Sequence, residues 1–448
     1  MAARACPIGS TAARHVGAPT FDSRQGSLFV PQADGCPRVA KIVLPLMWTF
    51  ANLACSPRRA RVRQTPLACV PLTILLASLA ACHRGGAGFE PCVVLVANQQ
   101  SNSVAVVDLG ALRVVRSIAV APGPAQVVAR PHTHQVYAVS PAGSVTVIGY
   151  PRLRVLATLH VGRSAASLVF SADGERLYAL DPESGEVVFG NGPDGQTPRE
   201  SGRVRLGGEL AGLALAPRAS GGRGGPEDIL LVTDRAAGRV WLLGGESRQV
   251  LGSVEVGKGA GPVVALPDGS RAFVADAAEN QVSAVDVAAR RVLAHLELAS
   301  RPSGLLLKPD GGELFVLSAD SALLTIVDAF HDEVEQTLPA GRGAISGTFR
   351  RDATVLYLAN SGDGSVTALD IQTRTVLDST RAGAEPRALA LTPDERYLVV
   401  ADAASASVAI LRAAVASSSS ARSALVTTIP VGPRPVDLAV LDWRWEEE

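Results

Sequence analysis

A short apolar segment that recurs along the chain from Val94 onward constrains the fold more than any other feature. It is written LYLAN at Leu356, and related segments begin at seven other positions: Val94, Val136, Leu177, Leu230, Ala272, Leu314 and Leu398. Successive starts are 41 to 53 residues apart, and five of the seven intervals are 42 residues. This regularity indicates one structural unit repeated about eight times.

Each unit contains four strand-like segments separated by turn residues. In the unit that begins at Leu356, residues 366–369 form a second segment and residues 387–391 form the fourth. Alternating Val, Leu and Ala favour half-buried strands. Pro-Asp-Gly turns follow the fourth segment at Pro267 and Pro309. Four strands in about 42 residues are typical of a β-propeller blade, so we predict an all-β chain with a single β-propeller.

The number of fourth strands predicts eight blades. These strands are expected to begin near eight positions: Pro124, Ala165, Leu210, Pro262, Pro302, Ala344, Pro386 and Pro435. The last of them, at 436–441, should join the first three strands at 93–118, which gives a 3+1 closure of the ring from both ends of the domain. Seven blades is the alternative, because insertions at 217–228 and 413–423 make the third and eighth units irregular.

The repeat resembles the YVTN family of β-propeller repeats in the segments LYLAN, SVTALD, TRTVLDS, AGAEPRALA and TPDER. The resemblance implies the propeller fold over about 350 residues. The family's Thr is mostly replaced by Ala here, and its Asn is kept only at Asn98 and Asn360. The resemblance says little about function, since propellers carry unrelated activities.

A lipoprotein signal peptide is predicted ahead of the repeats. Arginines at 58–63 precede an apolar run at 67–81, which is too short to span a bilayer comfortably. The run ends in Leu-Ala-Ala-Cys, which resembles the bacterial lipobox and implies that Cys82 becomes the lipidated N-terminus. The alternative is an ordinary exported protein with a cysteine at its cleavage site.

The predicted boundaries follow from these features. They are an unstructured or wrongly assigned extension at 1–57, the signal peptide at 58–82, a tether at 83–91, the propeller at 92–443 and a tail at 444–448. Because a signal peptide belongs at an N-terminus, we expect translation to start at Met47 or near Val62. The predicted location is the bacterial cell envelope, facing the periplasm or the cell surface. His83, where an Asp favours inner-membrane retention in well-studied bacteria, indicates the outer membrane.

Composition argues against several classes of function. Lys+Arg and Asp+Glu both number 42 and aromatic residues make up 4%, so nothing favours nucleic acid as a partner. The chain has no Cys-x-x-Cys-His, Gly-x-Ser-x-Gly, His-Glu-x-x-His or Walker motif, and no cofactor is predicted. His132 and His134 resemble a metal pair. They stand where other units carry Pro-Asp-Gly, so we expect solvent-facing rings and predict no metal site.

Charged residues in the loops before the innermost strands are the candidate ligand-binding residues. In the repeat frame they fall within a few residues of one another: Arg163, Glu209, Lys258, Arg301, Arg342, Glu385 and Arg434. They should converge on one mouth of the central channel, with basic groups in excess, which suits a small anionic ligand or an acidic peptide. The alternative is a solvated rim without a ligand.

The leading functional hypothesis is a membrane-anchored, exported propeller that acts as a monomeric binding or interaction scaffold without catalytic residues. The alternative is a lactonase-like hydrolase with its site at the channel mouth. That class needs a metal or a set of histidines and carboxylates, and the loops supply Glu209 and Glu385 but no histidine. A redox propeller with haem or quinone is favoured least.

Overall fold

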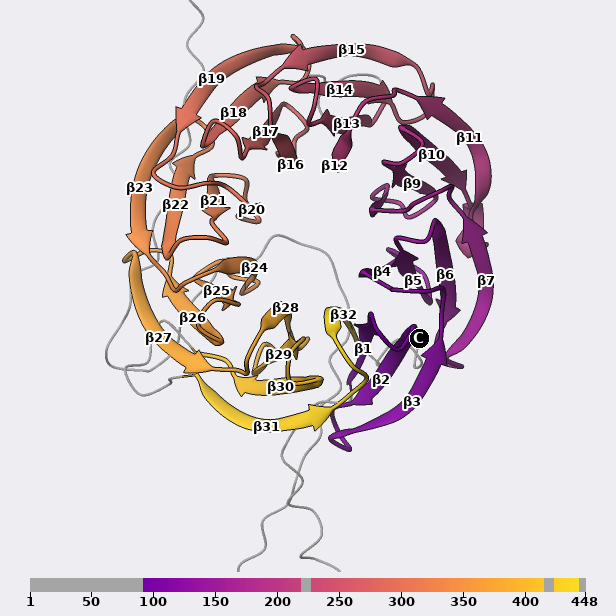
Figure 1. Cartoon of the computed structure of the whole chain (residues 1–448), viewed down its shortest axis with the longest axis vertical. Helices are drawn as coiled ribbons and strands as arrows, with labels where there is room; N and C mark the ends of the chain where they lie inside the picture. Colours follow the sequence, from indigo (N-terminus) through magenta and orange to yellow (C-terminus); the bar gives the residue numbers. More distant parts are fainter. Residues whose placement is uncertain (1–91, 219–226, 415–422, 443–448) are drawn as a thin grey trace, which may run out of the picture. The chain divides into compact units, whose positions relative to one another are not determined.

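Eight antiparallel β-sheets stand around a central axis (Figure 1). The computed structural model describes residues 92–218, 227–414 and 423–442. Within these ranges the chain forms strands β1 to β32 and one short 3₁₀ helix, η1 (Pro193–Gly195), and no α-helix. The predicted all-β propeller with eight four-stranded blades is therefore confirmed, and the seven-bladed alternative is wrong.

The blades are numbered here in chain order. Blade 1 consists of β1 (Cys92–Asn98), β2 (Ser103–Asp108), β3 (Arg113–Ala119) and β32 (Pro435–Asp442). Blade 2 consists of β4 (Gln126–Ala129), β5 (Gln135–Ser140), β6 (Ser144–Gly149) and β7 (Arg154–His160). Blade 3 consists of β8 (Ser167–Phe170), β9 (Arg176–Asp181), β10 (Glu186–Asn191) and β11 (Arg199–Arg205). Blade 4 consists of β12 (Leu210–Ala216), β13 (Ile229–Asp234), β14 (Arg239–Gly244) and β15 (Val250–Glu255).

The second half of the ring repeats this plan. Blade 5 consists of β16 (Ala260–Ala265), β17 (Arg271–Asp276), β18 (Gln281–Asp286) and β19 (Arg291–Glu297). Blade 6 consists of β20 (Gly304–Leu307), β21 (Glu313–Leu317), β22 (Leu323–Asp328) and β23 (Glu333–Pro339). Blade 7 consists of β24 (Ala344–Phe349), β25 (Val355–Asn360), β26 (Ser365–Asp370) and β27 (Thr375–Arg381). Blade 8 consists of β28 (Pro386–Leu391), β29 (Tyr397–Asp402), β30 (Ser407–Arg412) and β31 (Ala424–Pro430).

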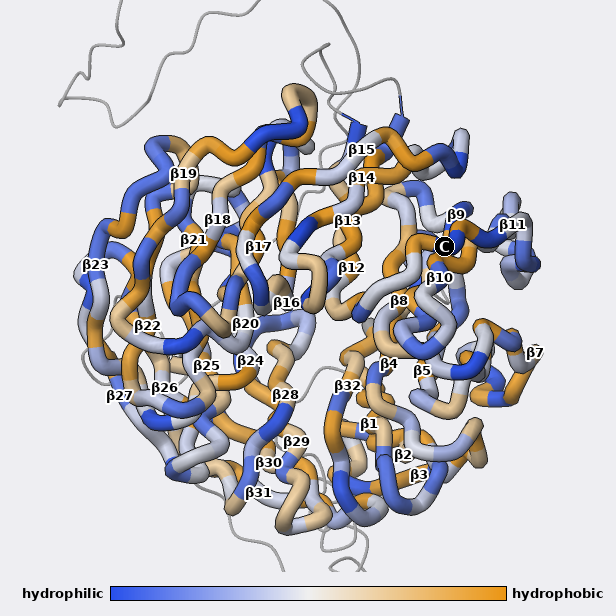
Figure 2. Tube along the Cα trace, turned by 45° about the horizontal axis from the view of Figure 1, so that its top comes forward, coloured by the Kyte–Doolittle hydropathy of each residue, from blue (hydrophilic) through white to orange (hydrophobic). Residues whose placement is uncertain are grey.

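Burial explains why the LYLAN-like segments are apolar throughout. Every residue of β25 and β29 is buried, whereas the outermost strand β23 is exposed at all but one position. The middle strands of a blade are covered on both faces by neighbouring blades. Val94 of blade 1, for example, belongs to one apolar cluster with Val399 and Ile410 of blade 8. Figure 2 shows the resulting mixture of apolar and polar residues around the ring.

The two ends of the domain share blade 1. Strand β32 pairs with β1, with Val440 opposite Val94 and Ala439 opposite Leu95, so the sheet order is β3-β2-β1-β32. This is the predicted 3+1 closure. The innermost strands begin within two residues of the predicted starts. Strands within a blade are counted here from the centre of the ring outward. In several blades the third strand ends in an aspartate that caps the next turn, as when Asp108 Oδ1 accepts the Ala111 N–H at 3.0 Å.

The predictions for residues 1–57, 58–82, 83–91 and 444–448, including Cys82, fall outside the described residues. The same holds for Trp443 and for most of the two predicted insertions, at 219–226 and 415–422. In the part of the chain that the structure describes, no helix has the length and apolar character needed to cross a membrane.

Candidate functional site

The loops before the innermost strands lie on one face of the propeller, because strands alternate in direction within each blade. A polar residue at the end of the second strand from the centre, or directly after it in blade 6, supports this face in every blade. These eight residues are at most 3% exposed: Asn98, Ser140, Asp181, Asp234, Asp276, Ser318, Asn360 and Asp402. Each is the last residue of a LYLAN-like segment, so the repeat alignment could have identified all eight, but no role was predicted for them from the sequence.

Asp181 shows how such a residue fixes a loop. Its carboxylate accepts the N–H groups of Arg163 at 2.9 Å and Ser164 at 3.1 Å, and the Ser164 hydroxyl at 2.8 Å. Burial opposes ionisation of Asp181. Hydrogen bonds from Ser184, Ser164 and Arg163 outweigh it and lower the pKa of Asp181 to about 2. The carboxylate therefore stays charged and holds the backbone from which the Arg163 side chain extends.

Two other predicted residues are positioned in the same way. Asp402 accepts the N–H of Glu385 at 2.7 Å, and Asp234 accepts the N–H of Glu209 at 3.2 Å. Buried carboxylates thus orient three of the seven predicted loops, and the charged side chains of those loops extend from a fixed backbone.

A cavity of about 540 Å³ opens on this face between blades 5 and 6. Its polar lining comes from Arg235, Arg301, Ser303 and Asp320, together with backbone at Gly259 and Gly261. Arg235 lies in the turn after β13, and Arg301 lies in the loop before β20. We call this cavity the channel-mouth cavity.

Glycine is required at position 259 of the channel-mouth cavity. Its φ is +112°, and an added Cβ would lie 2.5 Å from Asp276 Oδ1 and 2.7 Å from the Ala278 nitrogen. The same carboxylate oxygen accepts the N–H groups of Ala278 at 2.8 Å and Glu279 at 3.1 Å. The wall of the cavity therefore packs directly on a buried, hydrogen-bonded aspartate.

The two arginines give the channel-mouth cavity a basic character. The Arg235 guanidinium contacts Glu209 Oε1 at 3.2 Å, and both side chains are more than half exposed. Exposed ion pairs of this kind contribute about 0–1 kcal/mol, so a ligand anion can replace Glu209 at little cost. The Arg301 guanidinium has no hydrogen-bond or ion-pair partner among the described residues.

The seven predicted residues differ in their surroundings. Arg301 lines the channel-mouth cavity, and Glu209 reaches it through Arg235. Glu385 pairs with Arg387 at 3.3 Å, and Arg434 Nε donates to Gln99 Oε1 at 2.9 Å. The side chains of the remaining three make no ion pair or hydrogen bond with another described residue: Arg163, Lys258 and Arg342. A ligand-binding role for the whole set stays a prediction. Arg235, directly after the LLVTD segment, was missed.

Potential metal-ligating side chains do not cluster in the regions that the structure covers. No group of three or more His, Cys, Asp or Glu side chains there is arranged to hold a metal ion. His132 and His134 are both exposed, as expected, and the His134 ring packs against Tyr150 with a centroid separation of 5.2 Å.

The chain is similar to known propellers. The family described as "Lactonase, 7-bladed beta-propeller" matches residues 324–436. A solved structure described as "Dihydro-heme d1 dehydrogenase NirN in complex with DHE" is similar with a TM-score of 0.59 and 14% identity, covering 80% of this chain and 78% of that chain. Hydrazine synthase of Kuenenia stuttgartiensis has a TM-score of 0.46 and 17% identity, covering 60% of this chain and 87% of that chain. No curated protein sequence matches.

The lactonase family match and the similarity to the dehydrogenase structure support the β-propeller fold and leave the activity open. The lactonase match runs from β22 to β32, and every residue that lines the channel-mouth cavity precedes it. The family is also described as seven-bladed, whereas this chain has eight blades. The similarity to the dehydrogenase is too distant in sequence to carry over more than the fold.

Proposed function

We propose that this protein is an exported, lipid-anchored β-propeller that binds a small anionic ligand in the channel-mouth cavity. The observation that carries the proposal is the pair of arginines, Arg235 and Arg301, in a cavity of about 540 Å³. Small-molecule sites in proteins typically measure about 300–1,000 Å³. The lipobox-like sequence at Cys82 supports the envelope location.

The charges favour an anion that also carries hydroxyl groups. Guanidinium groups form charge-assisted hydrogen bonds with carboxylates and phosphates, and two of them can hold both ends of one small ligand. Ser303 and Asp320 add a hydroxyl and an acceptor to the same cavity. A sugar acid presents a carboxylate for the arginines and hydroxyl groups for Ser303 and Asp320, so gluconate and glucuronate are suitable probes.

Calorimetric titration of the full-length protein with gluconate, glucuronate and citrate tests this function. We expect Arg301→Ala and Arg235→Ala to weaken binding about tenfold or more, because each removes a hydrogen bond between charged groups. Arg163→Ala is the matched control, since Arg163 occupies the same loop of blade 3 but does not line the cavity. Equal losses in all three variants would indicate a diffuse charged rim instead.

A lactone hydrolase is the second candidate, and the match at residues 324–436 is the observation that favours it. Its test is proton release from gluconolactone, followed at constant pH with and without the protein. Catalysis that survives Arg301→Ala would separate such a site from the channel-mouth cavity. No release above the spontaneous rate would leave the binding scaffold as the better description.

A further inference from the structure

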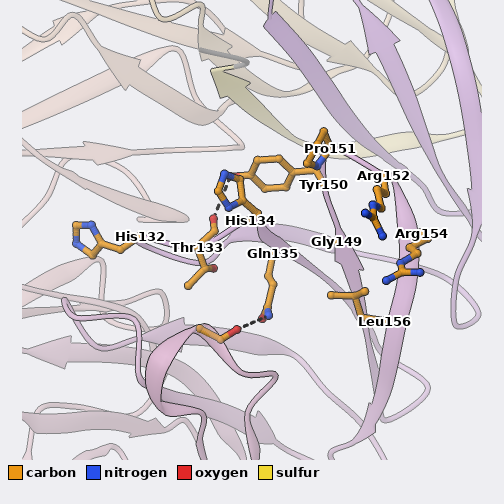
Figure 3. A pocket seen from close by; sticks show the side chains of 11 residues that line it. His132, Thr133, His134, Gln135, Gly149, Tyr150, Pro151, Arg152, Arg154 and Leu156 are labelled. Atoms are coloured by element: carbon orange, nitrogen blue, oxygen red, sulfur yellow. Dashed lines mark hydrogen bonds between the residues drawn. The ribbon is translucent and has the colours of Figure 1, made fainter. Parts of the chain in front are cut away.

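A second cavity, of about 430 Å³, lies in blade 2 on the face opposite the channel mouth (Figure 3). It is formed by the turn between β4 and β5 and by the turn between β6 and β7, which alternation of strand direction places at the far ends of the strands. Its ionisable lining residues are His132, His134, Tyr150, Arg152 and Arg154, with no carboxylate among the lining residues. We call it the blade 2 cavity.

Comparison with the other blades shows that this lining has lost its acidic groups. Strand β6 ends at Gly149, where four other blades end the third strand with a turn-capping aspartate: Asp108, Asp286, Asp328 and Asp370. His132 occupies the turn position that other units fill with an aspartate: Asp173, Asp268, Asp310 and Asp394. Arg152 occupies the position of Ala111, Ala289, His331 and Thr373. Blade 2 thus presents basic residues at positions where several other blades present carboxylates.

The turn between β4 and β5, which lines the blade 2 cavity, is fastened to blade 3. Arg130 is 3% exposed and donates to the carbonyl oxygens of Gly174 and Gln196, both at 2.6 Å. The Gln135 amide lines the cavity and donates to the Gly195 carbonyl oxygen at 2.7 Å. These hydrogen bonds fasten the cavity to blade 3, so its shape exists before any ligand arrives.

Unlike Arg130, whose guanidinium is occupied by backbone carbonyl oxygens, the two arginines that line the blade 2 cavity have unoccupied guanidinium groups among the described residues. Neither the Arg152 nor the Arg154 guanidinium forms an ion pair with a carboxylate of the described residues. Both side chains lie on the same wall in Figure 3. Their charge is therefore available to a bound anion.

Another wall of the blade 2 cavity is aromatic and apolar. The His134 and Tyr150 rings meet edge to face at an interplanar angle of 69°, and the Tyr150 hydroxyl donates to the Thr133 carbonyl oxygen at 3.0 Å. Leu156 lines the cavity and is 40% exposed. A Cβ at Gly149 would lie 2.8 Å from the Leu156 side chain, so glycine there lets Leu156 keep its place.

We propose that the blade 2 cavity binds an aromatic carboxylate. The flat ring packs against Tyr150 and Leu156, and the carboxylate accepts hydrogen bonds from Arg152 and Arg154. This site is independent of the channel-mouth cavity, which lies on the other face and takes its arginines from other blades.

The test is calorimetric titration of the full-length protein with phthalate, cyclohexane-1,2-dicarboxylate and inorganic phosphate. We expect phthalate to bind more tightly than the other two, because only it combines an aromatic ring with two carboxylates. Arg152→Ala with Arg154→Ala should weaken phthalate binding at least about tenfold. Arg291→Ala is the matched control, since Arg291 begins the outermost strand of blade 5 as Arg154 does in blade 2.

A folding control and one further variant test the two walls separately. Arg152→Ala with Arg154→Ala should leave the melting temperature unchanged, and Tyr150→Leu should reduce affinity for phthalate more than for phosphate. Unchanged melting temperatures would show that the variants are folded. The proposal is overturned if phthalate does not bind at millimolar concentration, if it binds no more tightly than phosphate, or if the double arginine variant binds it as well as the unchanged protein.

Discussion

Asp437 offers a direct test of how the ring is closed. It lies on β32, the strand that completes blade 1, and its Oδ2 accepts the N–H of Val127 in blade 2 at 2.8 Å. Burial raises the pKa of Asp437 from 3.8 to about 6, although hydrogen bonds from Val127 and Leu438 partly oppose the increase. The carboxyl group thus links the closing strand to the next blade and resists ionisation there.

The sign of the resulting pH dependence follows from linkage. A group with a raised pKa in the folded state stabilises the fold fully below its unfolded pKa, and this contribution is lost as pH rises through the folded pKa. The difference between 3.8 and about 6 corresponds to about 3 kcal/mol at most. The free energy of unfolding should therefore fall by up to that amount between about pH 4 and pH 7 through this group alone.

The variant Asp437→Asn isolates this contribution. Asparagine still offers an oxygen to the Val127 N–H but cannot ionise, so we expect it to match the unchanged protein near pH 4 and to be more stable by about 1–3 kcal/mol at pH 7.5. The measurement is urea unfolding from pH 4 to 8, monitored by fluorescence. Asp437→Ala, which removes the acceptor at every pH, is the control. A stability difference between Asn and Asp that does not change with pH would refute the reasoning.

Three other outcomes are expected, two from the structure and one from the sequence at Cys82. Asp181→Asn should lower the free energy of unfolding by about 2 kcal/mol at neutral pH, because the pKa of Asp181 is held at about 2 in the fold. This deficit should shrink as the pH falls from about 4 to 2, which acid unfolding of both proteins would check. Cys82→Ser should release the protein from the membrane fraction of the host cell, and continued sedimentation with membranes would contradict a lipid anchor. Deleting residues 435–448 removes β32, so the cooperative unfolding transition should be lost, as circular dichroism during heating would show.

The fold could be predicted from the sequence because every blade repeats the same buried apolar strand and many repeat the same turn residues. Residues 356–360 and their relatives are buried on both sides, so each copy needs a continuous apolar run. The turn aspartates recur with fixed spacing for an equally local reason, since Asp370 caps the N–H of Thr373 only three residues away. The turn caps depend on residues within one repeat, and the burial recurs because every blade packs between two others. Both features therefore recur with the period of the repeat and can be recognised in the sequence.

The candidate sites depend on which turns lie side by side in the fold, within one blade or between blades, and the repeat pattern does not show this. Aligning loops identified Arg301 but not Arg235, because Arg235 belongs to a different turn of a different blade. At the blade 2 cavity the sequence drew attention only to His132 and His134, for which no metal site was predicted. The basic character of the cavity depends on Arg152 and Arg154 lining it together, with Gly149 in place of a turn aspartate. Residues that differ from the repeat pattern are thus the candidates for a binding site, but only the fold shows which of them line the same cavity.

The sharing of blade 1 between the two ends of the domain sets an order of events for a chain that is synthesised from its N-terminus. Strand β1 pairs on one side with β2 and on the other with β32, so one edge of its sheet stays unsatisfied until the last strand is available. Open edges of this kind recruit other strands. While the rest of the chain is still emerging, the first blade is therefore an acceptor for any extended segment nearby. The cell must keep that edge away from other chains until the last strand arrives.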